Sequence, residues 1–310
     1  MQRRTFMAAL SGSASTLIGT QMTAFAGASS LSQLQNLQPS PRMPVLFVGH
    51  GSPLNVIEDN EFRPQWEALG GEFGSHASAK WPKPQLILCI SAHWITRDWW
   101  LTGMAQPKTI HDFGGFPQAL FDQQYPAPGA PAMAQALAAS LQQPHTHAPL
   151  GLDDHEWGFD HGSWAVLKPM FPRADIPVIQ LSMDYGRPPA EHYALGQQLK
   201  GLRERGVLIV GSGNIVHNLR TMQRSASNDQ AYDWAIEFDR AIGEQIAQGK
   251  LDELQNFQRL GQVAQLAHPT YDHYLPLLYA AGAADAKEVP QFFNAKFQGA
   301  SISMRSVIWG

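Results

Sequence analysis

The sequence contains little cysteine, no block of like charges and no long uninterrupted apolar run. Cys89 is the only cysteine among the 310 residues, so an internal disulfide is excluded and the fold does not depend on an oxidising compartment. Cys89 lies inside a predicted strand, and we interpret it as a core residue. The formal net charge is -4 at pH 7 and is spread along the chain, which argues against binding to nucleic acid or to an anionic membrane.

Several common catalytic signatures are also missing. Ser52 lacks the G-x-S-x-G pattern of a nucleophile elbow, so we do not expect a serine hydrolase. Residues 211–214 are rich in glycine but lack the remaining glycine and the early position of a dinucleotide fingerprint. No glycine-rich loop is followed by the lysine of a P-loop.

The N-terminus has the features of an export signal. Arg3 and Arg4 precede a weakly apolar stretch of small residues, and residues 24–26 form an A-x-A cleavage site. We therefore expect a twin-arginine signal peptide over residues 1–26, recognition by the twin-arginine export machinery and a periplasmic location. The apolar stretch is too short and too interrupted for a stable membrane span. Residues 27–42 are expected to form a flexible linker to a single domain over residues 43–310.

The remaining chain alternates between predicted strands and helices. Apolar and β-branched runs predict strands at 45–49, 86–91, 177–182, 207–211 and 301–308. Amphipathic or alanine-rich segments predict helices at 130–142, 189–205, 231–248 and 273–281, the last kinked or short because it contains Pro276. This alternation predicts an α/β domain with helices on both faces of a central sheet. The long connections at 92–129 and 144–176 are expected to be functional loops over a site.

Histidines follow the predicted strands at the edge where ligands bind. The chain has twelve histidines, of which His50 and His93 each follow a buried strand, and His217 lies in a glycine-rich turn after another. His273 stands near the start of the late apolar helix and would complete a three-histidine set suited to Fe(II) or Zn(II). His217 is expected to be either a fourth ligand or an acid/base.

A second group of residues is expected to line a substrate pocket. His161 lies between glycines and aromatic residues, including Trp164, which is typical of an apolar-walled pocket for a flat organic substrate. The alternative is a loop histidine packed on Trp164. His111 is expected either to line the same pocket or to anchor its loop.

Seven motifs occur in a fixed order: GHGSPLNVIEDN, SAHW, TIHDFGGFPQALFDQQYPAPG, WGFDHGSW, IPVIQLSMD, GSGNIVHNLR and DHYLPLLY. With them, residues 43–310 resemble the class III extradiol ring-cleavage dioxygenases, in the DOPA 4,5-dioxygenase branch shared by bacteria and plants. The resemblance implies a single α/β domain with a central, mostly parallel sheet flanked by helices. It also implies an oxidoreductase that opens the ring of a DOPA-like catechol with O2 to a muconic semialdehyde.

The resemblance assigns roles to individual residues. His50 and His93 match the first two metal ligands, and His273 stands where related ring-cleaving enzymes place a glutamate ligand. His217 matches the acid/base histidine, and His161 the histidine that contacts substrate. One divalent metal ion per subunit is implied. Fe(II) is expected for activity because oxygen activation needs a redox metal, whereas three neutral histidines would leave the site more positive and would also bind Zn(II) readily.

Two other functions remain open at this point. A zinc hydrolase could use the same histidines to activate water, with Glu58, Asp160 or Asp272 as the acid or base. A non-catalytic metal-binding protein could share the fold. Arg220 and Lys108 are candidate partners for a substrate carboxylate, and the sequence does not indicate an oligomeric state.

Overall fold

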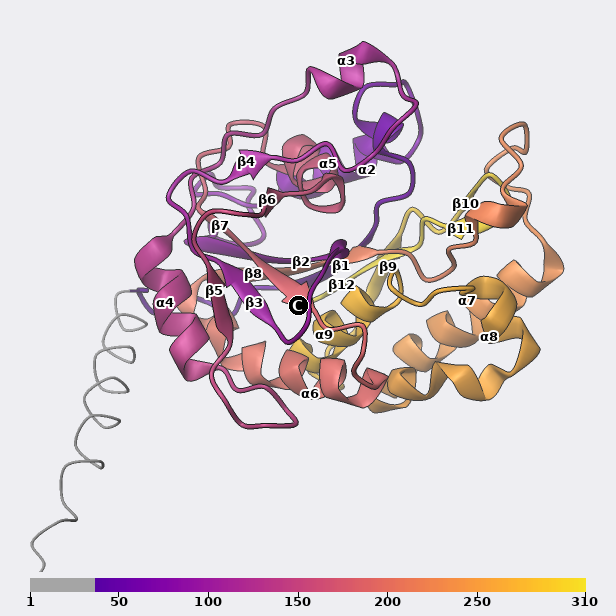
Figure 1. The fold of residues 1–310 in the computed structure, drawn as a ribbon. Coiled ribbons are helices and arrows are strands. Elements are labelled where there is room, and N and C mark those ends of the chain that lie inside the picture. The colour runs from indigo at the N-terminus through magenta and orange to yellow at the C-terminus, as the bar shows by residue number, and fades with distance from the viewer. Residues whose placement is uncertain (1–36) are drawn as a thin grey trace, which may run out of the picture.

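The computed structural model describes residues 37–310, which form an eight-stranded sheet between two layers of helices (Figure 1). The strand order is β5 (Gly151–Asp153), β3 (Trp100–Thr102), β7 (Val178–Met183), β2 (Leu86–Ile95), β8 (Val207–Gly213), β1 (Val45–Gly49), β12 (Ser306–Trp309) and β9 (Gln291–Phe293). The four central strands β7, β2, β8 and β1 are parallel, and antiparallel pairings join β3 to β7 and β12 to both β1 and β9. The predicted α/β fold with a mostly parallel central sheet is therefore confirmed.

Helices cover both faces of the sheet (Figure 1). One face carries α2 (Arg63–Gly70) and α5 (His161–Met170), and the other carries α4 (Pro131–Ser140), α6 (Pro189–Leu199), α7 (Asp233–Ala247), α8 (Gln262–Ala267) and α9 (Leu275–Ala283). Short 3₁₀ segments occur at Pro53–Val56, Lys200–Arg205, Leu219–Thr221 and Leu251–Leu260.

The central strands are apolar on both sides because both sides are covered. Along β1, Val45 and Phe47 pack in the core beneath α9, whereas Leu46 and Val48 pack in the core beneath α2 and α5. Cys89 belongs to the second core, and its burial raises the pKa of the thiol to about 12. It is the core residue that the sequence predicts.

Several element boundaries differ from the prediction. The strand predicted at 86–91 continues to Ile95 and so includes His93. The strand predicted at 301–308 is two strands, because β11 (Ile302–Ser303) pairs with β10 (Phe297–Gln298) while β12 pairs with β1. Pro276 falls in the first turn of α9, where a missing N–H costs nothing, and the helix is short rather than kinked.

The two long connections contain more regular structure than expected. The first includes β3, β4 (Lys108–Thr109) and the short helix α3 (Gln118–Phe121), and the second includes β5, β6 (Gly158–Phe159) and α5. His161 is therefore the first residue of a helix, not a loop residue. Asp160 caps that helix by accepting the Ser163 N–H at 3.1 Å, a signal hidden by the surrounding glycines and aromatics.

The end of the predicted linker is docked on the domain. The Gln38 N–H donates to Gln85 Oε1 at 3.1 Å, and the Ser40 N–H donates to the Glu204 carbonyl at 3.0 Å. Residues 37–42 are thus held by hydrogen bonds, so the expectation of a flexible linker is wrong for them. The predicted signal peptide and residues 27–36 lie outside the described residues. Across residues 37–310, no helix combines the length and the apolar character needed to cross a membrane.

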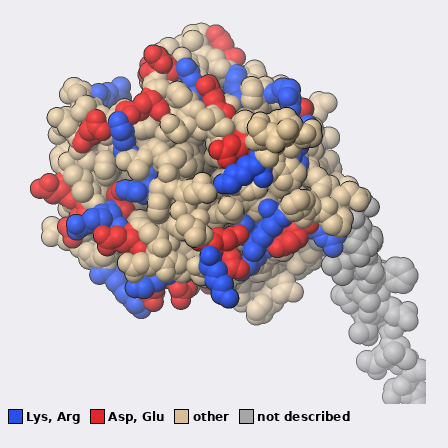
Figure 2. All heavy atoms as spheres, turned by 180° about the vertical axis from the view of Figure 1, so that it is seen from behind, with Lys and Arg blue, Asp and Glu red and all other residues tan. Residues whose placement is uncertain are grey.

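Charge on the molecule is mixed in sign. Figure 2 shows Lys and Arg side chains interspersed with Asp and Glu over the face turned away in Figure 1. That face therefore offers no field of one sign to a polyanion, in line with the absence of charge blocks in the sequence.

Candidate metal centre

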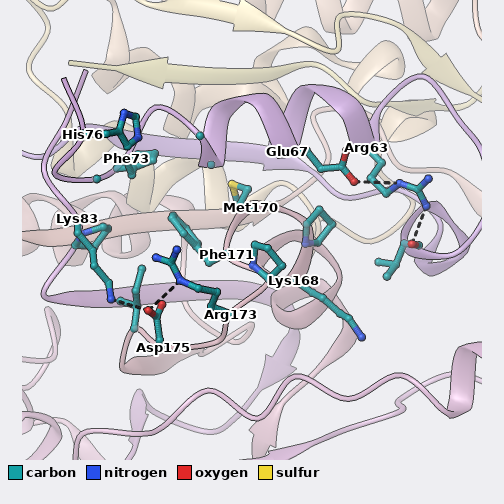
Figure 3. Close-up of a pocket in the computed structure, with 18 of the residues that line it drawn as sticks. Arg63, Glu67, Phe73, His76, Lys83, Lys168, Met170, Phe171, Arg173 and Asp175 are labelled. Atoms are coloured by element: carbon teal, nitrogen blue, oxygen red, sulfur yellow. Dashed lines mark hydrogen bonds and ion pairs between the residues drawn. The ribbon is translucent and has the colours of Figure 1, made fainter. Parts of the chain in front are cut away.

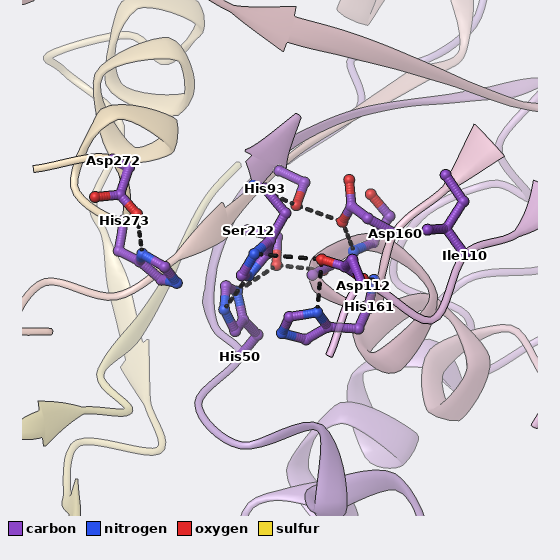
Figure 4. Close-up of polar contacts among 12 residues, drawn as sticks. His50, His93, Ile110, Asp112, Asp160, His161, Ser212, Asp272 and His273 are labelled. Atoms are coloured by element: carbon purple, nitrogen blue, oxygen red, sulfur yellow. Dashed lines mark hydrogen bonds and ion pairs between the residues drawn. The ribbon is translucent and has the colours of Figure 1, made fainter. Parts of the chain in front are cut away.

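Four histidines from distant parts of the chain meet at the carboxyl edge of the central strands (Figure 4). His50 directly follows β1, His93 lies near the end of β2, His273 stands two residues before α9, and His161 begins α5. The glycines of the 49–51 segment allow this turn: Gly51 has a φ of 57°, in the left-handed region that favours glycine.

Three of these rings are spaced like ligands of one ion. One ligand atom from each of His50, His93 and His273 lies within 4.8 Å of the others. His50 Nε2 and His93 Nε2 are 3.3 Å apart. Two nitrogen ligands at about 2.0–2.1 Å from a tetrahedral ion are roughly 3.3–3.4 Å apart, so this spacing fits a transition metal.

Each of these rings has an acceptor near Nδ1 that leaves Nε2 free. Ser212 donates its hydroxyl proton to the Gly162 carbonyl, so its oxygen accepts from His50 Nδ1–H at 3.0 Å. His273 Nδ1–H donates to the Asp272 carboxylate at 2.7 Å. His93 Nδ1 lies 3.4 Å from Asp112 Oδ2. Such partners fix the tautomer in which Nε2 carries the lone pair that a metal needs.

Burial keeps these imidazoles neutral. Burial, followed by repulsion from neighbouring histidines, lowers the pKa of His50 and His273 well below the usual value and the pKa of His93 to about 3. Neutral imidazoles are the form that binds metal. Facing lone pairs without protons between them favour a cation, so the donor set fits a divalent ion.

His217 lies beside this set without joining it. Its ring stacks on His273 with centroids 3.5 Å apart and planes 6° from parallel. Because imidazole lone pairs lie in the ring plane, two such rings do not converge on one ion. Burial, and then the charge of His268, lowers the pKa of His217 to about 4. The arrangement favours a neutral base next to the metal ligands over a fourth ligand.

His161 faces the set from the other side. Its ring centroid is 3.9 Å from that of His93 and 5.7 Å from that of His50. Asp112 contacts it twice, since Oδ2 lies 2.9 Å from His161 Nδ1 and Oδ1 accepts the His161 backbone N–H at 2.9 Å. Burial would raise the pKa of Asp112, but the hydrogen bond from His161 outweighs it and the pKa falls to about 2.

Sequence reasoning missed Asp112. In the sequence, only its position next to His111 in the TIHDFGGFP motif pointed to a role for Asp112. An acidic residue in a loop is ordinarily solvated. In the structure, a ligand atom of Asp112 lies within 4.8 Å of those of His93 and His161, and its side chain is only 16% exposed.

His111 and Trp164 support the loop above the site. His111 Nε2–H donates to the Gln123 carbonyl at 2.9 Å, and its ring packs edge-on against Trp164. Trp164 is fully buried and donates from Nε1 to the Ile110 carbonyl at 2.9 Å. The prediction that Trp164 contacts substrate does not fit the structure, because no surface of that residue is accessible. The hydrogen bond of His111 favours the second of its two predicted roles, the loop anchor, and a role in lining the pocket stays a prediction.

The carboxylates that a hydrolase would use are engaged elsewhere or exposed. Asp160 is buried, accepts hydrogen bonds from Ser91, Gln180 and Ser163, and has its pKa raised by burial and by Asp112. Asp272 is bound to His273. Glu58 is exposed, as are Lys108 and Arg220. Glu58 and Asp160 are thus not presented to the histidines as free acids or bases, and Asp272 is committed through Oδ2 to His273.

A separate cavity of about 730 Å³ lies at the opposite edge of the sheet, between α2 and the end of α5 (Figure 3). It contains none of the metal-centre histidines. Its charges are largely paired within it, since Lys83 and Arg173 both bind Asp175, and Arg63 binds Glu67. This pairing makes it a poor candidate for the active site.

Comparison with known proteins adds independent information. Residues 44–304 match the family described as the catalytic LigB subunit of aromatic ring-opening dioxygenase. The chain is 45% identical over 273 residues to 4,5-DOPA dioxygenase extradiol of Escherichia coli K12, covering 87% of this chain and 96% of that protein. It is 33% identical over 269 residues to a protein of the same name from Beta vulgaris, covering 84% and 94% of the two chains.

A solved structure agrees with the fold. The crystal structure of an uncharacterized protein from Escherichia coli K12 superposes with a TM-score of 0.71 at 40% sequence identity, covering 87% of this chain and all of that one. The family model and these relatives span nearly the whole described domain. The chain therefore belongs to the LigB family of class III extradiol ring-cleavage dioxygenases, the metal-dependent enzymes that its motifs resemble.

Proposed function

We propose that this enzyme opens the ring of a DOPA-like catechol with O2, giving a muconic semialdehyde, at one divalent metal held by His50, His93 and His273. The observation that carries the proposal is the convergence of three histidine ligand atoms within 4.8 Å, with Nδ1 hydrogen-bonded in His50 and His273 and beside a carboxylate in His93. A ferrous ion there would supply the redox chemistry with O2 and bind the two ring oxygens, whereas zinc would bind without that chemistry.

The chain's own residues would move the protons. His217 is neutral near pH 7 because burial lowers the pKa, so its free nitrogen can accept a proton from a catechol hydroxyl and return it later. His161 Nδ1 lies 2.9 Å from Asp112 Oδ2, and with a proton on Nδ1 the ring would offer Nε2 as a second acceptor. His217 stacks on His273 and His161 lies against His93, so each base stands beside a different ligand, where the two hydroxyls of a bound catechol could each reach one.

An aromatic wall stands next to these groups. Phe113 packs edge-on against His161 with centroids 5.6 Å apart, and Phe116 packs edge-on against Phe113. Apolar rings beside two bases suit a flat aromatic substrate and limit the entry of water.

Oxygen consumption tests the proposal. The protein is loaded with Fe(II), its iron content is verified, and it is mixed with L-DOPA, caffeic acid and further catechols. We expect O2 uptake together with a new visible absorbance from the opened ring, and no reaction from zinc-loaded protein. Failure across the panel with iron in place would reject the proposal, and substrate turnover by the zinc form without O2 would point to a hydrolase.

We also propose export through the twin-arginine route, on the basis of Arg3, Arg4 and the A-x-A site. Cell fractionation of the full chain should recover a shortened protein from the periplasm. The variant Arg3→Lys/Arg4→Lys should remain in the cytoplasm at full length. A wild-type chain found uncleaved in the cytoplasm would refute export.

A further inference from the structure

We propose that Asp112 is a positioning residue that sets the tautomer of His161, placing the proton on Nδ1 and leaving Nε2 as the base that faces the metal centre. This inference rests on the proposed function, in which His161 accepts a substrate proton. It concerns a residue outside the three-histidine set, contributed by the segment between β4 and α3.

The two oxygens of Asp112 have different partners. Oδ1 accepts the backbone N–H of His161 at 2.9 Å, and Oδ2 accepts from Nδ1 of the same residue at 2.9 Å. A backbone N–H can only donate, so it fixes which way the carboxyl group is turned. The second oxygen then has one orientation toward the ring, and an ionised oxygen can only accept. Nδ1 must therefore carry the proton.

His161 is the main partner of this oxygen. Oδ2 also lies 3.4 Å from His93 Nδ1, which is ion-pair distance rather than a strong hydrogen bond. His93 already directs Nε2 toward His50 at 3.3 Å. Figure 4 shows Asp112 between the rings of His93 and His161, with His50 beyond them. The shorter contact and the additional backbone contact both belong to His161.

The segment that carries Asp112 is anchored at the two residues just before it. The Ile110 N–H donates to the Phe159 carbonyl at 2.7 Å, and Trp164 donates to the Ile110 carbonyl at 2.9 Å. His111 binds the Gln123 carbonyl. Gly114 and Gly115 follow and face open space. Asp112 therefore follows directly on the hydrogen-bonded part of the segment and precedes the two glycines.

The variant Asp112→Asn tests the assignment. The amide oxygen can still accept the His161 backbone N–H, which turns the amide NH2 toward Nδ1. An NH2 group can pair with Nδ1 only when Nδ1 is unprotonated, so His161 should change to the Nε2–H tautomer. The ring nitrogens of ¹⁵N-histidine-labelled, zinc-loaded protein report this change by NMR, with His161→Ala identifying the signal.

Kinetics provide the second readout. Iron-loaded Asp112→Asn should retain its metal and nearly the same KM, while kcat falls on the order of 10²–10⁴-fold, the usual size of a lost acid/base contribution. The matched control is Asp122→Asn, the same chemical change on an exposed carboxylate that binds only Gln118. It should change neither readout.

A double variant separates positioning from folding. If Asp112 acts through His161, adding Asp112→Asn to His161→Ala should change kcat less than threefold. An equal loss in both backgrounds, or an unchanged His161 tautomer in Asp112→Asn, would overturn the assignment. A tautomer shift in protein that cleaves no catechol would support the assignment to Asp112 while rejecting the proposed function.

Discussion

His273→Ala is expected to abolish stoichiometric metal binding, whereas His217→Ala is expected to keep the metal and lose turnover on the order of 10²–10⁴-fold. The two rings are stacked with centroids 3.5 Å apart, so side-chain size and location are matched between the variants. The two residues differ in where their ring nitrogens lie. Only His273 offers a ligand atom within 4.8 Å of those of His50 and His93.

Removing the His273 imidazole would leave two ligands, and the Asp272 carboxylate would lose its hydrogen-bond partner. Two imidazoles do not complete the three-ligand set that open catalytic sites use, so affinity should fall below that needed to retain the ion through gel filtration. Removing His217 takes away a neutral base but no ligand. Elemental analysis after desalting, combined with oxygen uptake, measures both quantities.

The exposed residue His155 provides the control, because His155→Ala removes an imidazole that belongs to neither group of possible metal ligands. It should alter neither metal content nor turnover. Retention of one metal ion per chain by His273→Ala would contradict the ligand assignment. Loss of the metal from His217→Ala would make that residue a ligand.

Arg203→Met is expected to lower the free energy of unfolding by about 3–5 kcal/mol, the usual cost of breaking a buried ion pair from one side. Arg203 is fully buried and binds both oxygens of Glu288 at 2.9 and 2.6 Å. Its guanidinium also donates to the carbonyls of Met43 and Ala283. It therefore joins the segment entering β1 to the end of α9.

Chemical denaturation should show this loss, and the melting temperature should fall by roughly 6–20 °C. The control Arg240→Met breaks an exposed pair with Glu244, which should cost under about 1 kcal/mol. Equal stability of Arg203→Met and Arg240→Met would show that the buried pair contributes nothing beyond a surface pair.

The effect should also depend on pH. Burial would raise the pKa of Glu288, but hydrogen bonds from Arg203 and from the Asp285 N–H outweigh it, and the pKa lies below its usual value. A lowered folded-state pKa stabilises the fold above the unfolded value and ceases to do so as pH falls through the folded value. The difference between wild type and Arg203→Met should thus be full at pH 7 and shrink below about pH 4.

The central strands and the histidines at their ends could be predicted from sequence because one physical rule covers both. A strand buried on two faces reads as a continuous apolar run, and its carboxyl end lies at the same edge as its parallel neighbours. His50 and His93 followed from that rule. His273 was predicted less directly, because a helix start carries no equivalent rule and only its combination with His50 and His93 suggested a third ligand.

The surrounding layer was harder to predict. Trp164 beside His161 resembled a pocket wall, but α5 is buried along most of its length and Trp164 is fully enclosed. Asp112 could not be assigned because nothing local distinguishes a carboxylate that holds an imidazole from one that faces water. Contacts between a loop and a helix 49 residues apart in sequence depend on tertiary packing.

The hydrogen bond between Asp272 and His273 adds negative charge next to the metal centre. Three neutral imidazoles alone would leave a divalent ion with its full charge, as the sequence suggested. The structure instead places one carboxylate behind His273 and another behind His93. A glutamate ligand would bring negative charge into direct contact with the ion. Here the negative charge lies behind the imidazole rings instead, on the side away from the ion. An ion there would be held by uncharged nitrogens, while the two carboxylates behind the imidazoles would compensate its charge.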